Sequence, residues 1–196
     1  MVRKAMAKWP NVPHCFHWLA LDARGVWRLR DERAQALNLP GDRLTHPALV
    51  GFINRNYLHD ERGCWYFQNG PQRVYVDLEA TPYVARTDPA QGFVLHTGDA
   101  MPALETAWMM PQGQLLLQCG QIVALVDDRD LASCTAAIEI GGSPMADEAL
   151  LAWIASNAAP DAAPMLRHRE QRVPLRRIAP EDIERTFKFV RIPQPD

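Results

Sequence analysis

The clearest structural signal in the chain is the stretch Cys64-Trp-Tyr-Phe-Gln-Asn-Gly-Pro-Gln-Arg-Val-Tyr-Val-Asp-Leu-Glu79. Its Asn69-Gly70 stands between two runs rich in aromatic and β-branched residues. Asn-Gly is the preferred two-residue turn of a β-hairpin, because both turn positions need a positive φ. The sequence therefore predicts a tight hairpin, in which Tyr66 pairs with Arg73.

The alternation of side chains along these two strands predicts two different faces, because successive residues of a strand point to opposite sides. The apolar face is predicted to lie in the core, and it carries Trp65, Phe67, Val74, Val76 and Leu78. The other face is predicted to meet solvent or a partner, and it carries Cys64, Tyr66, Arg73, Tyr75, Asp77 and Glu79. Tyrosine and arginine are the residue types that dominate binding hot spots. We therefore predict a binding surface at Tyr66, Arg73, Tyr75 and Arg86, although a simple Tyr–Arg stack would explain the same cluster.

Upstream of the hairpin the sequence predicts a strand pair and a helix. Trp18–Leu21 and Val26–Leu29 flank the turn signal Asp22-Ala-Arg-Gly25 and are predicted to pair. A helix is predicted from His46 to about Leu58, because Thr45 can cap it and apolar residues recur along one side.

Downstream, runs of short strands separated by turns favour an α+β fold over a doubly wound sheet. We predict two small antiparallel β-rich lobes, each packed with one or two helices. Residues 1–86 would form the N-terminal lobe with the hairpin. Residues 87–196 would form the C-terminal lobe, with a helix at 144–156 and a basic C-terminal extension.

Composition excludes several classes of protein. The chain has 196 residues, is 47% hydrophobic and carries a formal net charge of -2, which gives no general attraction to nucleic acid or anionic membranes. The arginine-rich run 167–177 could bind phosphate, but it favours an edge strand that charge and Pro174 keep from pairing further. Nucleic acid is therefore not an expected partner.

The chain also lacks signals for export or membrane insertion. It opens without the apolar core of a secretory signal, and its longest apolar stretch, 149–155, is far shorter than a membrane span. Its four cysteines are widely spaced and contain no CxxC pair, which favours free thiols over two long-range disulfides. We expect a cytoplasmic protein that contacts no membrane.

Two constellations could carry chemistry. Cys64, with His59 a few residues upstream, is the best candidate for a cysteine nucleophile and its base, although an unreactive strand cysteine explains it as well. His14, Cys15 and His17 are three potential metal ligands, but they lack the spacing of known zinc motifs. Phosphate-binding, dinucleotide-binding and serine-hydrolase motifs are absent, so no cofactor is predicted.

Three blocks of the sequence resemble a proteobacterial family of unknown function. The first is His46-Pro-Ala-Leu-Val-Gly-Phe-Ile-Asn-Arg-Asn-Tyr57, the second runs from Asp60 through the hairpin to Ala85, and the third is His96-Thr-Gly-Asp99. They are also distantly similar to a second uncharacterised bacterial family with a two-lobed α+β structure. This resemblance implies the fold and no activity, cofactor or catalytic residue.

The absence of a catalytic constellation favours a soluble binding or regulatory module that recognises an unknown small molecule or protein. The surface would be the Tyr66, Arg73 and Tyr75 face together with Arg86. The alternative is a small enzyme that uses Cys64 and His59, or a metal held by His14, Cys15 and His17.

Overall fold

The structure, a computed structural model, describes residues 12–156 and 162–195, and these fall into two compact units. The first unit extends to Pro82 and takes up the chain again at Lys188, and the second comprises Tyr83–Phe187. The chain passes from the first unit to the second between Pro82 and Tyr83. The boundary was predicted near residue 86, and that residue lies inside the strand β7 (Tyr83–Asp88). Residues 1–11 of the predicted N-terminal lobe lie outside the described residues.

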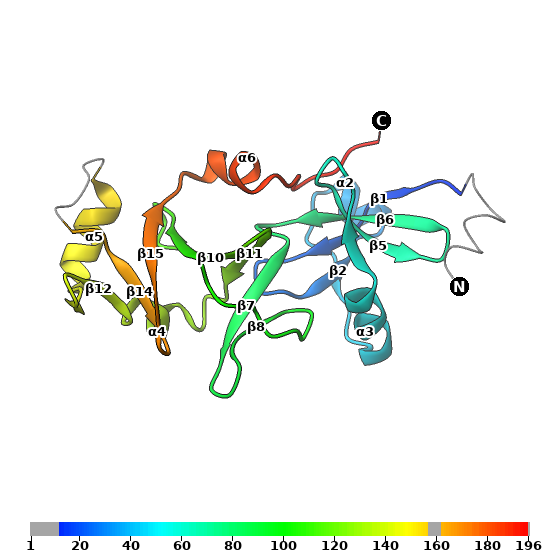
Figure 1. Cartoon of the computed structure of the whole chain (residues 1–196). Coiled ribbons are helices and arrows are strands. Elements are labelled where there is room, and N and C mark those ends of the chain that lie inside the picture. Colours follow the sequence, from blue (N-terminus) through cyan, green and yellow to red (C-terminus); the bar gives the residue numbers. More distant parts are fainter. Residues whose placement is uncertain (1–11, 157–161, 196) are drawn as a thin grey trace. The chain divides into compact units, whose positions relative to one another are not determined.

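The first unit is built on a six-stranded sheet with the order β3-β2-β1-β6-β5-β4 (Figure 1). The β1–β2 pair confirms the predicted strand pair, but β1 lies parallel to β6, so the pairing is not purely antiparallel. The strands are β1 (Cys15–Leu21), β2 (Trp27–Leu29), β3 (Asp42–Arg43), β4 (Tyr57–His59), β5 (Trp65–Asn69) and β6 (Gln72–Leu78).

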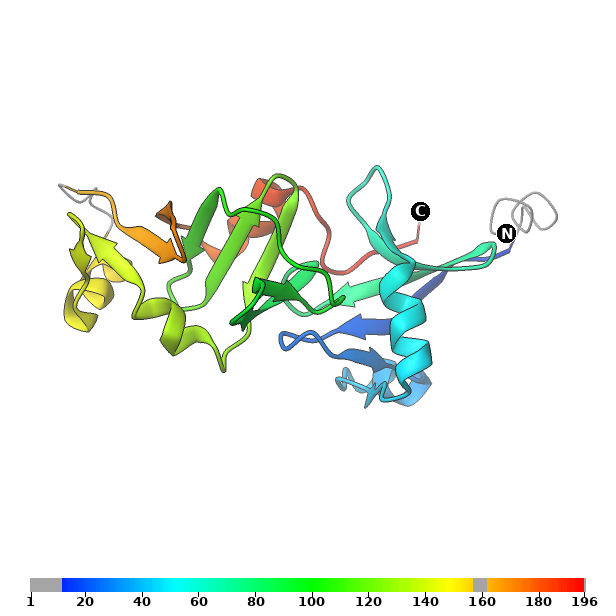
Figure 2. The ribbon, with the colours of Figure 1, turned by 60° about the horizontal axis from the view of Figure 1, so that its bottom comes forward.

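Two short helices of this unit lie among its described residues, α2 (Glu32–Ala36) and α3 (Pro47–Arg55). Helix α3 is shorter than predicted, and its N-cap is His46, whose ring accepts a hydrogen bond from the Leu49 amide, rather than Thr45. Figure 2 shows α3 lying across the strands, and the rings of Phe52 and Phe67 meet edge to face with centroids 5.4 Å apart. One face of the hairpin is therefore covered by this helix.

The hairpin is present, but its register differs from the prediction. Tyr66 pairs with Tyr75 rather than with Arg73, and the two loop residues are Gly70 and Pro71. Gly70 has φ 59, and a glycine at the first loop position suits the type II′ turn, which proline can follow. The partner shifts by two residues, so the division of side chains between the two faces stays as predicted.

The second face of the hairpin is also buried, which corrects the prediction that it is exposed. Tyr66 and Tyr75 are 6% and 2% exposed. The last residues of the chain lie along this part of the sheet: the Val190 amide donates to the Gly63 carbonyl at 3.0 Å, and the Leu78 amide to the Arg191 carbonyl at 2.8 Å. Tyr66 and Tyr75 thus pack in an apolar cluster against Val190.

The second unit holds a nine-stranded sheet with the order β13-β12-β14-β15-β9-β10-β11-β7-β8. Strand β11 pairs parallel to β7, and β15 parallel to β9, while the other pairs are antiparallel. Besides β7, the strands are β8 (Gly92–Leu95), β9 (Thr106–Met109), β10 (Leu115–Cys119), β11 (Ile122–Val126), β12 (Ile138–Ile140), β13 (Ser143–Pro144), β14 (Met165–His168) and β15 (Gln171–Arg177).

Two local predictions for this unit are corrected. The arginine-rich run is not an edge strand, because β15 lies between β14 and β9. The helix expected at 144–156 is α5 (Asp147–Ala155), since Pro144 is part of β13. The remaining helical elements are α4 (Leu131–Thr135), the 3-10 helix η1 (Pro180–Asp182) and α6 (Ile183–Phe187). The α+β fold class is confirmed.

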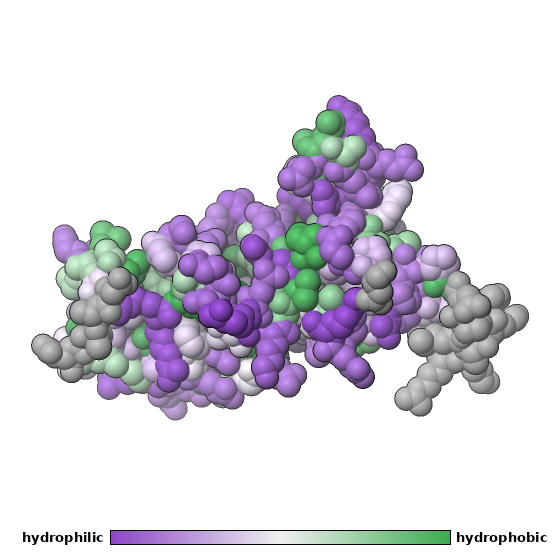
Figure 3. Space-filling view, turned by 90° about the horizontal axis from the view of Figure 1, so that it is seen from above, coloured by the Kyte–Doolittle hydropathy of each residue, from purple (hydrophilic) through white to green (hydrophobic). Residues whose placement is uncertain are grey.

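The surface drawn in Figure 3 is mostly hydrophilic, and its apolar residues form small separate groups. None of the helices in the described part of the chain is long and apolar enough to cross a lipid bilayer.

Candidate functional site

A pocket of about 810 Å³ opens in the first unit beside the hairpin. It gathers three of the four residues predicted to bind a ligand, together with two of the histidines from the chemical hypotheses. The residues that line it are His14, Phe16, His59, Asp60, Glu61, Arg62, Tyr66, Arg73, Tyr75 and Pro195.

The wall of this pocket is aromatic, and an irregularity in β1 places part of it. Between the pairs Cys15–Val74 and Leu19–Val76, β1 advances four residues while β6 advances two. His17, with φ 67, lies inside this bulge. The Phe16 ring stacks on that of Tyr75 at a centroid distance of 4.5 Å and an interplanar angle of 6°. The bulge thus lets β1 cover a tyrosine that the sequence pattern leaves exposed.

Arg73 supplies positive charge to the pocket. Its guanidinium carbon lies 4.6 Å from the centroid of the Tyr66 ring, a cation–π contact. The Tyr75 hydroxyl beside it raises the pKa of Arg73 further above its usual value. Among the described residues no carboxylate forms an ion pair with Arg73, so the guanidinium donors that do not face the Tyr75 hydroxyl remain available to a ligand.

Asp60 is the acidic counterpart of Arg73, and its charge is used within the protein. One carboxylate oxygen accepts from the backbone amides of Cys64 and Arg62 at 2.9 and 3.0 Å, and the other accepts from the Tyr75 hydroxyl at 3.0 Å. Burial alone would raise the pKa of Asp60, but these hydrogen bonds outweigh it and hold the pKa below its ordinary value. Asp60 therefore stays ionised and fixes the Tyr75 hydroxyl.

The two histidines contribute rings to the rim of the pocket. His14 meets Tyr75 edge to face with centroids 5.8 Å apart, and His59 packs against Trp65 at 5.0 Å. His59 Nδ1 lies 3.0 Å from the Asp60 carbonyl oxygen. This contact directs the Nδ1 side of the His59 ring toward the loop that follows β4.

Cys64 is placed behind the pocket wall, because it is 4% exposed and packs in the apolar cluster of Tyr66 and Tyr75. His59 lines the pocket and Cys64 does not. A thiol enclosed by aromatic rings is poorly placed to attack a bound ligand. The geometry therefore argues against a Cys64 nucleophile with His59 as its base.

The proposed metal ligands His14, Cys15 and His17 also go to different places. His14 lines the pocket, Cys15 is a half-buried strand residue, and His17 contacts Asp77. Within the described ranges no three His, Cys, Asp or Glu side chains come together as metal ligands. The geometry does not support the metal hypothesis.

Sequence reasoning missed a buried polar cluster on the same side of β6. Asp77 is only 4% exposed, although it was predicted on the solvent-facing side. Arg30 Nη1 donates to it at 2.7 Å, and His17 Nδ1 lies 3.1 Å from its other oxygen. A carboxylate in a run of apolar strand residues is a signal of such pairing, because a buried charge needs a partner.

Arg86, the fourth predicted binding residue, belongs to the second unit. Its guanidinium faces Asp127 and Asp130 at 3.9 and 3.8 Å. It is therefore part of a local acidic cluster and not of the pocket lining described above.

A family model described as "DUF2944: Protein of unknown function (DUF2946)" matches residues 1–194. The chain belongs to this family. No curated protein matches the chain. The match to this family model confirms the predicted resemblance to a family of unknown function.

Two solved structures are similar to the chain. A DUF1285 family protein from Silicibacter pomeroyi DSS-3 matches with a TM-score of 0.50 and 16% sequence identity, over 84% of this chain and 83% of the other. A DUF1285 family protein from Shewanella baltica OS155 has a TM-score of 0.38 and 13% identity, over 59% of this chain and 88% of the other. The first of these two likenesses shows that the DUF2944 chain shares its fold with a second bacterial family.

Proposed function

We propose that the protein is a binding module whose first-unit pocket takes a small-molecule anion with an aromatic or other flat body. The observation that carries this proposal is the Arg73 guanidinium, which lies over the Tyr66 ring without a carboxylate partner among the described residues. An arginine at a pocket is well suited to a carboxylate or phosphate, because its planar fork of donors matches two oxygens at once.

The rest of the pocket supports a ligand with a flat body. Phe16, Tyr66 and Tyr75 form an aromatic wall, and the volume of about 810 Å³ lies in the range of small-molecule sites. Because Asp60 is held by the Tyr75 hydroxyl and two backbone amides, its charge is partly compensated and repels an anion less strongly than an unpaired carboxylate would.

We propose further that this module acts in the cytoplasm. The four cysteines form no disulfide in the structure, which fits a reducing compartment. Small anionic metabolites occur in that compartment, and binding one of them is compatible with either a sensing or a regulatory role.

Calorimetric titration with phenyl phosphate, an anion with an aromatic body, tests this function. Benzyl alcohol is the uncharged comparison. The wild-type chain should bind phenyl phosphate and not benzyl alcohol. Arg73→Gln should weaken binding by at least about tenfold, because a hydrogen bond to a charged group is lost.

Arg43→Gln is the matched control, since Arg43 is an exposed arginine of the same unit that does not line the pocket. It should leave the affinity for phenyl phosphate unchanged. Equal losses in the two variants, or equal affinity for benzyl alcohol, would contradict the proposal.

A further inference from the structure

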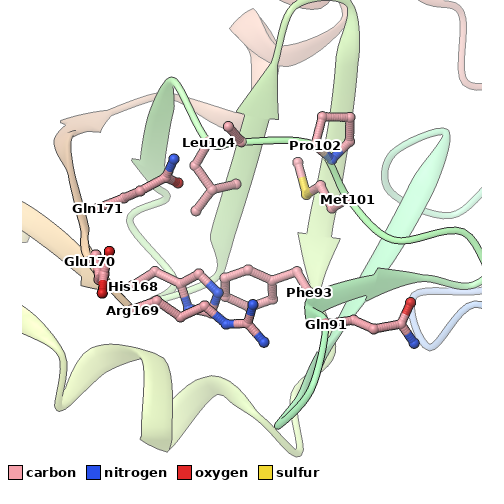
Figure 4. Close-up of a pocket in the computed structure, with 10 residues that line it drawn as sticks. Gln91, Phe93, Met101, Pro102, Leu104, His168, Arg169, Glu170 and Gln171 are labelled. Carbon is pink, nitrogen blue, oxygen red and sulfur yellow. The ribbon is translucent and has the colours of Figure 1, made fainter.

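The second unit contains a pocket of its own, of about 500 Å³, which the proposed function does not involve. Two hairpin tips and one loop border it: the turn between β7 and β8, the turn between β14 and β15, and the segment that follows β8 (Figure 4). The lining residues are Gln91, Phe93, Met101, Pro102, Ala103, Leu104, His168, Arg169, Glu170 and Gln171.

The two hairpin tips touch because Gly92 has no side chain. A Cβ at this position would lie 2.7 Å from His168 Nε2 and 3.3 Å from Arg169 Nε, and Gly92 has φ +88. Arg169 Nη2 also donates to the Pro89 carbonyl at 3.1 Å. The glycine leaves room for the Arg169 side chain beside the first tip, and this hydrogen bond orients its guanidinium.

His168 is the polar neighbour of Arg169 and is uncharged near neutral pH. Its ring lies over that of Phe93 with centroids 4.2 Å apart and an interplanar angle of 30°. Burial, and then the charge of Arg169, lower the pKa of His168 below its ordinary value. The positive charge at this edge of the pocket therefore belongs to Arg169, while the imidazole offers a neutral hydrogen-bonding group.

The opposite side of the pocket is apolar. Figure 4 shows Leu104, Met101 and Pro102 facing His168 and Arg169 across it. Met101 and Leu104 on this side are each 8% exposed and belong to the core of this unit. Phe93, which is 3% exposed and packs against His168 on the other side, belongs to the same core. A cationic edge opposite an apolar wall complements a molecule with one anionic end and one apolar end.

We propose that this pocket binds a small amphipathic monocarboxylate, with its carboxylate on Arg169 and its apolar chain against Phe93, Met101 and Leu104. Glu170 also lines the pocket, and Figure 4 shows its carboxylate on the far side of His168 from the Arg169 guanidinium. This second charge disfavours ligands with more than one negative charge. The site requires nothing of the first-unit pocket.

Titration of the full-length chain with octanoate tests this site, with octanol, octylamine and acetate as the comparison probes. The charge of Arg169 predicts that octanoate binds more tightly than octanol or octylamine. The apolar wall predicts that acetate binds much more weakly than octanoate. Equal affinity for octanoate and octylamine would overturn the role of Arg169, and equal affinity for acetate would overturn the role of the apolar wall.

Two variants of the turn locate the binding. Arg169→Gln should weaken octanoate binding by about tenfold or more, because a charged hydrogen bond is lost. Glu170→Gln is the matched neighbour and should leave binding equal or tighter. Octanoate binding that is unaffected by Arg169→Gln would place the ligand elsewhere and overturn the proposal.

A third variant separates this site from the proposed function. Arg73→Gln should leave the affinity for octanoate unchanged, and Arg169→Gln should leave the affinity for phenyl phosphate unchanged. Loss of octanoate binding in Arg73→Gln would overturn the inference while leaving the first-unit pocket intact.

Discussion

The hairpins of the two units differ in what covers them. In the first unit the β5–β6 hairpin is covered on one face by α3 and on the other by a segment from the end of the chain, Lys188–Pro195. In the second unit, which is one continuous run of chain, the tip of the β14–β15 hairpin stays exposed at Arg169 and Glu170. The alternation of residues along a strand shows which side chains share a face. Whether a face with polar residues is buried depends on segments from elsewhere in the chain, which that alternation does not reveal.

The largest effect expected from this comparison follows Phe189→Ala. Phe189 is 4% exposed in the returning segment, and loss of a buried phenylalanine costs about 3–5 kcal/mol. Pulse proteolysis in urea, with fragments assigned to each unit by mass spectrometry, measures the free energy of unfolding of each. The loss should fall on the first unit.

Ile192→Ala is the control within the same segment, because Ile192 is 48% exposed and should cost little. If Phe189→Ala destabilised the second unit as much as the first, the segment Lys188–Pro195 would not stabilise the first-unit hairpin specifically.

The next largest effect concerns Asp77, whose carboxylate is buried in the first unit although its face of the hairpin was predicted to meet solvent or a partner. Asp77→Asn should destabilise the first unit by about 3 kcal/mol, since it leaves Arg30 without its buried partner. The exposed Asp42, on β3 of the same unit, provides the control Asp42→Asn, with an expected change within about 0.5 kcal/mol. Equal changes in both variants would mean that the Asp77 cluster contributes nothing specific.

The second unit should differ from the first in its response to acid. His96 is buried there, its Nδ1 accepts a hydrogen bond from the Val84 amide at 3.3 Å, and burial lowers its pKa from 6.5 to about 3. The nearby Asp99 carboxylate opposes this shift only in part. The folded unit therefore keeps His96 neutral, whereas the unfolded chain takes up a proton below pH 6.5.

The stability that neutral His96 contributes is thus complete above pH 6.5 and declines as the pH falls toward about 3. Between pH 6.5 and about 4.5 the second unit should lose about 2–3 kcal/mol. Pulse proteolysis across this range measures the loss. His96→Gln should flatten the profile, since a glutamine amide does not titrate, and an equally steep profile in that variant would assign the effect to another group.

Local patterns predicted much of the first unit. The alternation along residues 64–79 placed each side chain of the hairpin on its correct face, and the turn at Asp22–Gly25 separated two strands that do pair. Both depend on neighbours in the sequence, so short-range rules suffice.

What the sequence could not reveal depends on distant contacts. The burial of Tyr66 and Tyr75 requires Val190 from the end of the chain and the β1 bulge at His17, and neither leaves a periodic signal. The second-unit pocket has the same origin, because Gly92 and His168 belong to hairpins far apart in sequence. The sequence identified the candidate binding residues by their residue types. The pocket that they line became visible only in the structure.

The smallest effect tests whether the buried face of the first-unit hairpin serves binding as well as packing. Tyr75→Phe removes the hydroxyl that donates to Asp60, which should cost about 1 kcal/mol in the first unit. Tyr57→Phe, which removes a buried hydroxyl that donates to the Pro82 carbonyl, should cost a similar amount. Only Tyr75→Phe should also change the affinity for phenyl phosphate, because the Tyr75 hydroxyl lies beside Arg73 in the pocket and Tyr57 does not line it. Equal stability losses with unchanged affinity in both variants would mean that the Tyr75 hydroxyl supports the fold alone.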